Sequence, residues 1–179
     1  MLKKHWSNIV LVFVVLLLIN PSLKEWFLRT IAFSPSFNSE QEELSSYAWE
    51  LHGLNTDNFS FDDAKGKVVF VNFWATWCPP CRAELPSIQN LYATYKDDVV
   101  FVFVTQEPKE VVVDFFEKNN YDLPVYNAAS RIPAQFATTN SIPATYVLNK
   151  EGKIVLSKVG AADWDSDKTK DKINQLLSE

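Results

Sequence analysis

The chain contains two cysteines, Cys78 and Cys81, separated by two prolines, and this pair is the part of the sequence best suited to chemistry. Residues 68–74 before it are β-branched and aromatic, which is typical of a strand buried on both faces. Residues 79–95 after it have apolar positions at helical spacing. We therefore predict Cys78 at a helix N-terminus, where free N–H groups and the helix dipole stabilise a thiolate. Cys78 would attack a partner's disulfide, and Cys81, one turn deeper, would resolve the mixed disulfide.

Three other interpretations of the cysteine pair fit the sequence less well. A structural disulfide across so short a loop would remove little chain entropy and would add little stability. A zinc half-site would need two more ligands, and the histidines of the chain are His5, near the N-terminus, and His52. Two unrelated thiols would not be expected between a strand and a helix. We predict no metal and no added cofactor, because the Cys78–Cys81 disulfide or dithiol is itself the redox group.

The remaining sequence predicts an α/β sandwich around a mixed sheet, which would hold this pair. The predicted strands are residues 49–52, 58–61, 68–74, 99–105, 123–126, 144–148 and 154–159, and the last two are joined by a hairpin turn at 150–153. The predicted helices are residues 79–95, 109–119, a short one at 131–137 and a terminal one at 165–177.

Residues 1–23 are basic at first and then apolar. Lys3 and Lys4 precede the uninterrupted apolar run 9–19, and residues 6–23 carry no charge. As a helix these uncharged residues would reach about 27 Å, roughly one hydrocarbon core. We favour an uncleaved single-pass membrane anchor over a cleaved signal peptide, because no Ala-x-Ala pattern follows the apolar run. Either interpretation exports the rest of the chain.

The composition divides the chain into a leader, a spacer and one exported domain. Residues 24–46, of which 32–46 are polar and acidic, are predicted to form a juxtamembrane spacer, and residues 47–179 form the domain. The net charge is -5, of which residues 1–31 carry +3 and the remainder -8. Because phosphate binding needs clustered Lys and Arg, this acidic body argues against a nucleic-acid partner. We place the domain on the periplasmic or extracytoplasmic side of the cell membrane.

Several separate motifs resemble the thioredoxin superfamily, and more closely its extracytoplasmic TlpA/ResA-like branch, over about residues 47–179. The matching segments are the active-site block at 73–81 (FWATWCPPC), Pro86 in the active-site helix, Ile142-Pro143 in the cis-proline loop and the hairpin at 150–153. The resemblance implies a thioredoxin fold, a central mixed sheet flanked by helices, here with an N-terminal transmembrane helix.

The resemblance also implies roles for residues that surround the cysteines. Trp77, Pro79 and Pro80 would contact the substrate. The backbone of Ile142, before a cis Pro143, would be free to pair with a substrate strand. A cis X-Pro bond costs only about 0.5–1 kcal/mol over trans.

One position departs from the cytoplasmic thioredoxins, which have a buried Asp on the strand before the cysteines. This chain has Asn72 there, which does not titrate. Glu84 lies three residues after Cys81 on the same helix face, and the ResA-like branch has a Glu at this place. A partly buried Glu84 with a raised pKa would pass a proton to or from Cys81. The alternative is a solvated carboxylate in the first turns of the helix.

The motifs and the resemblance together predict a membrane-tethered thiol–disulfide oxidoreductase that reduces disulfide-containing exported proteins. The branch includes reductases that serve apocytochrome c maturation, which suggests the direction. An exported reductase needs an electron supply, so a membrane thiol-transfer protein is the implied electron donor. The alternatives are a disulfide oxidase or isomerase, a peroxidase, and a non-catalytic binding module with the same fold.

Overall fold

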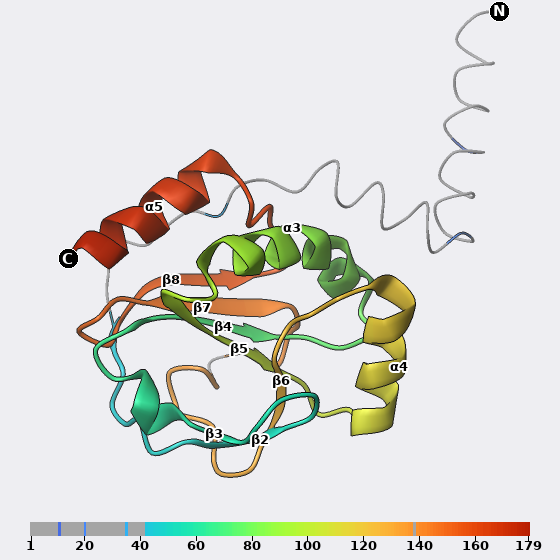
Figure 1. The fold of residues 1–179 in the computed structure, drawn as a ribbon, viewed down its shortest axis with the longest axis horizontal. Coiled ribbons are helices and arrows are strands. Elements are labelled where there is room, and N and C mark those ends of the chain that lie inside the picture. The colour runs from blue at the N-terminus through green and yellow to red at the C-terminus, as the bar shows by residue number, and fades with distance from the viewer. Residues whose placement is uncertain (1–10, 12–19, 21–34, 36–41, 138) are drawn as a thin grey trace, which may run out of the picture.

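The computed structural model describes residues 11, 20, 35, 42–137 and 139–179 (Figure 1). The anchor predicted at 1–23 and most of the spacer predicted at 24–46 lie outside these residues. Within the described part of the chain, no helix is both long enough and apolar enough to cross a membrane.

In the described residues, eight strands form one mixed sheet in the order β1-β8-β7-β4-β5-β6-β2-β3. Strands β4 and β5 are parallel, as are β5 and β6, whereas the other neighbouring strands are antiparallel. The strands are β1 (Glu42–Glu43), β2 (Glu50–Gly53), β3 (Phe59–Ser60), β4 (Val68–Phe73), β5 (Val99–Val104), β6 (Val125–Ala128), β7 (Ala144–Leu148) and β8 (Lys153–Val159). The helices are the 3-10 helix η1 (Phe61–Ala64), α3 (Pro79–Tyr95), α4 (Lys109–Asn119) and α5 (Asp167–Ser178).

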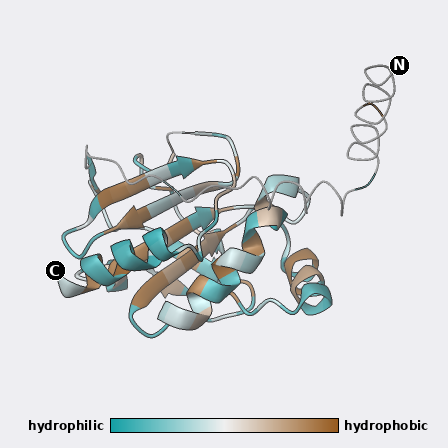
Figure 2. Cartoon of the chain, turned by 90° about the horizontal axis from the view of Figure 1, so that it is seen from above, coloured by the Kyte–Doolittle hydropathy of each residue, from teal (hydrophilic) through white to brown (hydrophobic). Residues whose placement is uncertain are grey.

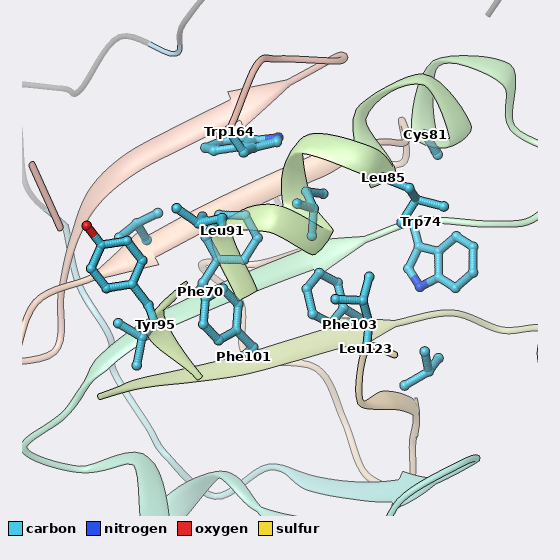
Figure 3. Close-up of a cluster of buried hydrophobic side chains, with 14 of the residues drawn as sticks. Phe70, Trp74, Cys81, Leu85, Leu91, Tyr95, Phe101, Phe103, Leu123 and Trp164 are labelled. Atoms are coloured by element: carbon cyan, nitrogen blue, oxygen red, sulfur yellow. The ribbon is translucent and has the colours of Figure 1, made fainter. Parts of the chain in front are cut away.

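Alternate residues of the central strands face two separate hydrophobic clusters. In β4, Val68 and Phe70 belong to the first cluster, and Val69 and Val71 belong to the second. This alternation is expected for a strand buried on both faces, and the central strands are mostly hydrophobic in Figure 2. Helices α3, α4 and α5 all contribute to the first cluster, part of which Figure 3 shows. Strand β2, helix η1 and the loop before β7 cover the second cluster.

The sequence predicted most of these elements. Helices α3 and α4 have the predicted bounds, and the other predicted strands and the terminal helix shift by at most two residues at each end. The short helix predicted at 131–137 is wrong, because this segment forms only a turn closed on the carbonyl of Pro133. A single turn fixes several backbone dihedrals for few hydrogen bonds, so it does not persist as a helix. The burial of Phe136 in the second cluster holds the segment instead.

Strand β1 falls within the segment that we assigned to the spacer. It pairs with the first residues of β8. The next residue, Leu44, is buried in the second cluster, and its backbone N–H donates to the carbonyl of Gly152 at 3.0 Å. The acidic residues of β1 carry no alternating apolar pattern, so the sequence offered no strand signal here. The folded sheet therefore includes residues from Glu42 onward.

We expect Leu44→Ala to lower the free energy of unfolding by about 2–3 kcal/mol, because it removes a buried side chain. Glu42→Ala is the matched control, since Glu42 lies two residues earlier and is exposed, and it should change stability by less than about 0.5 kcal/mol. Urea denaturation of both variants measures the difference. Equal stabilities for the two variants would mean that the segment does not belong to the folded domain.

Candidate active site

Cys78 and Cys81 form a disulfide where β4 leads into α3. As predicted, Cys78 caps the N-terminus of the helix, and its Sγ accepts a hydrogen bond from the backbone N–H of Cys81 at 3.3 Å. Pro79 and Pro80 occupy the first helical positions, where the missing N–H costs no intrahelical bond. Both cysteine side chains are buried. A thiolate at Cys78 would thus face the positive end of the helix.

The loop before β7 lies against the cysteine pair. The Ile142–Pro143 peptide bond is cis, as predicted. The carbonyl oxygen of Ile142 lies 3.8 Å from Cys78 Sγ. Pro143 is buried, whereas Ile142 is half-buried. The backbone of Ile142 therefore stands directly beside the sulfur that would attack a substrate.

A pocket of about 800 Å³ opens next to residues that flank Cys78, although neither cysteine lines it. Trp77 and Ile142 line it, and the Trp77 side chain is 70% exposed. The other predicted substrate contacts are not among its lining residues: Pro79 and Pro80 are half-buried at the start of α3, and Pro143 is buried. The rest of the lining is Phe73, Trp74, Ala75, Val104, Thr105, Gln106, Glu107, Pro108, Asn127, Ala128, Ile132 and Asn140. A segment of a substrate bound here would lie next to the disulfide.

Glu107, in the segment that follows β5, is a site residue that the sequence analysis missed. Its half-buried carboxylate accepts hydrogen bonds from the backbone N–H of Thr76 at 2.7 Å and from the Thr76 hydroxyl at 2.6 Å. The Thr105 hydroxyl donates to the same carboxylate at 3.3 Å. The side-chain amide of Asn127 donates to the backbone carbonyls of Thr105 and Glu107 at 2.6 and 3.3 Å. These bonds fix the loop that carries Cys78 to the wall of the pocket.

Glu84 is buried beneath α3, and only 2% of it is exposed. Its Oε2 accepts hydrogen bonds from Trp164 Nε1 at 2.9 Å and from the backbone N–H of Ala162 at 3.2 Å. Its Oε1 accepts a bond from Asn72 Nδ2 at 2.9 Å. Burial raises the pKa of Glu84 to about 7, although these hydrogen bonds and the charge of Lys158 act to lower it. This burial excludes the solvated carboxylate that we considered as the alternative.

The burial of Glu84 gives the site a group that can hold or release a proton near neutral pH. Glu84 lies one helical turn after Cys81, and it is anchored to the strand that leads to Cys78. Trp164, which donates to Glu84, is fully buried and packs edge-on against Phe70. Its contact with Glu84 has no sequence signal, since the two residues are 80 positions apart.

Comparisons with known proteins agree with this geometry. The sequence profile described as Redoxin matches residues 33–177. The thioredoxin-like protein YneN of Bacillus subtilis (strain 168) is 34% identical over 165 residues, which are 89% of this chain and 92% of that protein. The thiol-disulfide oxidoreductase ResA of Bacillus subtilis (strain 168) is 34% identical over 107 residues, which are 59% of this chain and 60% of that protein.

Solved structures share the fold. The crystal structure of a thioredoxin family thiol:disulfide interchange protein from Chlorobium tepidum TLS has a TM-score of 0.63 and 24% identity, and the match covers 78% of this chain and 99% of that chain. The structure of StoA from Bacillus subtilis has a TM-score of 0.55 and 26% identity, covering 75% of this chain and 97% of that chain. The predicted thioredoxin fold is therefore confirmed. Among the described residues, no group of three or more His, Cys, Asp or Glu could hold a metal ion.

The buried carboxyl predicts a pH dependence of stability. Native Glu84 keeps its proton up to a pKa of about 7, whereas the reference pKa is 4.5, so the native state binds more protons between these values. The free energy of unfolding of the oxidised protein should therefore fall as the pH rises through this window, by up to about 3 kcal/mol relative to Glu84→Gln. Urea denaturation at several pH values measures this difference.

The quantity to compare is how the free energy of unfolding changes with pH. A constant difference in stability between the wild type and Glu84→Gln is not informative. Glu110→Gln is the control, because Glu110 is an exposed glutamate of α4. Its stability curve should run parallel to that of the wild type. A Glu84→Gln curve that also runs parallel would show that the native carboxyl is ionised throughout the window.

Proposed function

The chain belongs to the Redoxin family and is a thiol–disulfide oxidoreductase, and from this premise we propose that it reduces the disulfides of exported proteins. The observation that carries the proposal is the placement of Cys78. Its sulfur stands at a helix N-terminus, 3.8 Å from the carbonyl of Ile142. The pocket lined by Trp77 and Ile142 lies beside it. A substrate strand along Ile142 would bring its disulfide to this sulfur.

The proposed reaction transfers two electrons to the substrate. The thiolate of reduced Cys78 attacks one sulfur of the substrate disulfide and forms a mixed disulfide with it. The substrate S–S bond breaks, and the other substrate sulfur leaves as a thiolate and takes up a proton. Cys81 then loses its proton to the carboxylate of Glu84 and attacks Cys78 Sγ. The substrate sulfur that was bound to Cys78 leaves and is protonated in turn, and the Cys78–Cys81 disulfide is formed. The enzyme is thereby oxidised and the substrate is reduced to a dithiol.

The reductive direction is supported by the charge around the pair. Strong oxidants of this chemistry stabilise their reduced form through a very low thiol pKa. Here a buried carboxyl lies one helical turn from Cys81 and, once ionised, opposes a second negative charge nearby. The resemblance to the ResA-like branch supports the same direction.

The proposed location is the outer face of the cell membrane, in the periplasm or extracytoplasmic space. The predicted anchor at 1–23 would tether the domain there. Disulfide-containing exported proteins are the proposed substrates, with apocytochrome c as one candidate. The Cys78–Cys81 disulfide left after each turnover would be reduced by a membrane thiol-transfer protein, because exported proteins have no direct access to cytoplasmic thiols.

We expect Cys81→Ser to accumulate mixed disulfides between Cys78 and its substrates, since the resolving thiol is absent. Cells expressing this variant should yield complexes that a reductant releases, whereas the Cys78→Ser control should yield none.

We also expect the reduction potential of the wild type to lie nearer the thioredoxin value of about -270 mV than the value of about -120 mV of a strong oxidant. A potential near the second value would replace the reductase proposal by a disulfide oxidase.

We expect Glu84→Gln to change the pH profile of thiol reactivity in the reduced protein. Burial raises the pKa of Glu84 to about 7 in the oxidised protein. In the reduced protein its ionisation should add an inflection to the pH profile of the alkylation rate of Cys78, because its charge acts on both thiols. The variant should lose this inflection and keep the one that belongs to the thiol itself. Identical profiles would remove Glu84 from the proposed proton transfer.

A further inference from the structure

Asn72 joins Glu84 to the neighbouring strand. Asn72 on β4 lies directly opposite Thr145 on β7, and both side chains are buried. The Nδ2 group of Asn72 donates to Glu84 Oε1 at 2.9 Å and to Thr145 Oγ1 at 2.8 Å. In the described part of the chain, Asn72 Oδ1 is buried and has no hydrogen-bond partner. Because no donor in that part of the chain binds Oδ1, no hydrogen bond on that side holds the amide in this orientation.

The three groups that hydrogen-bond the carboxyl of Glu84 are all donors. They are Trp164 Nε1, the backbone N–H of Ala162 and Asn72 Nδ2. This set suits an ionised carboxylate. A protonated carboxyl also carries an O–H, which needs an acceptor. An indole N–H and a backbone N–H cannot accept, whereas a side-chain amide presents either its NH2 group or its oxygen after a half-turn.

We propose that Asn72 is a positioning residue whose side-chain amide reverses when Glu84 takes up a proton. In the reversed orientation, Asn72 Oδ1 occupies the place of Nδ2 and accepts the O–H of Glu84, while the NH2 group moves to the place where Oδ1 now has no partner among the described residues. The hydroxyl of Thr145 then donates to the same oxygen, although it accepts from Nδ2 when Glu84 is ionised. A hydroxyl can make both bonds because it is both donor and acceptor. The proton comes from Cys81 during thiol exchange and returns to solvent or to a thiolate.

Among the groups around Glu84, the side-chain amide of Asn72 is the one that can change its hydrogen bonding with the protonation state of Glu84. The charged group that acts on Glu84 is Lys158 of β8. Strands β4 and β7 contribute the neutral side chains of Asn72 and Thr145, and the loop before α5 contributes Trp164 and the backbone of Ala162. A fixed donor stabilises only the carboxylate, whereas a reversible amide hydrogen-bonds both protonation states. Asn72 would thus let Glu84 exchange a proton without leaving its buried position.

This inference deepens the proposed role of Glu84 as a proton carrier, and its test is independent of the reductase proposal. The measurement uses the oxidised full-length chain, in which neither cysteine titrates. The 13C resonance of the Glu84 carboxyl, assigned through Glu84→Gln, reports the midpoint of its titration in the wild type, in Asn72→Leu and in Trp164→Phe.

The comparison of the two variants separates a reversing amide from a fixed donor. Trp164→Phe removes a fixed donor, so the midpoint of Glu84 should rise by about one pH unit. Asn72→Leu removes a hydrogen-bond partner of both protonation states of Glu84. The midpoint of Glu84 in this variant should therefore rise by less than half of the rise in Trp164→Phe, or fall. A rise in Asn72→Leu of half or more of that in Trp164→Phe would overturn the proposal, because it would make Asn72 a donor only.

A second measurement needs no variant at Asn72. In the wild type, nuclear Overhauser contacts between the Asn72 amide protons and the Thr145 methyl group should weaken as Glu84 takes up its proton, because the NH2 group turns away from Thr145. Contacts that keep their intensity through the titration of Glu84 would overturn the reversal even if Asn72→Leu did not fold.

Discussion

The burial of β4 on both faces is the constraint on which the active site depends. A strand packed between two hydrophobic clusters has no freedom to slide or to rotate. The alternation of side chains along β4 therefore places Asn72 on the face that α3 covers. The C-terminal end of β4 determines where Cys78 begins the helix. The parallel pairing with β5 brings Glu107 back beside Thr76. The positions of Asn72, Thr76 and Cys78 thus follow from the position of one rigid strand.

The site combines this rigidity with a buried acid, Glu84, that forms no ion pair with the residues that the structure describes. Burying an ionised carboxylate is costly unless donors replace its water. Glu84 accepts hydrogen bonds from three such donors. Two of them, Ala162 and Trp164, lie in the loop before α5, and the third, Asn72, lies on β4. They offset part of the cost and leave the pKa of Glu84 at about 7. The effect of burial therefore exceeds that of the donors, and the acid lies near neutral pH, where small changes in its surroundings alter its charge.

The sequence predicted what is local and missed what depends on distant packing. The position of Cys78, the bounds of α3 and α4 and the cis Pro143 follow from neighbouring residues or from a family motif. The burial of Glu84 was underestimated, because the indole that covers it comes from 80 residues away. The hydrogen bonds that Thr76 donates to Glu107 span 31 residues, and no spacing pattern in the sequence indicates them. Strand β1 and the turn at 131–137 likewise owe their form to the surfaces that they meet.

The hydrogen bond between Trp164 and Glu84 has an optical consequence. The indole of Trp164 is fully buried and donates a hydrogen bond to an ionisable group. A change in the charge of that group would alter the emission of this fluorophore. Trp164 packs against Phe70, so its ring is also held in one orientation. Trp164 is thus placed to act as an intrinsic reporter beside Glu84, and the part of the emission that comes from this indole would follow the state of the proton at Glu84.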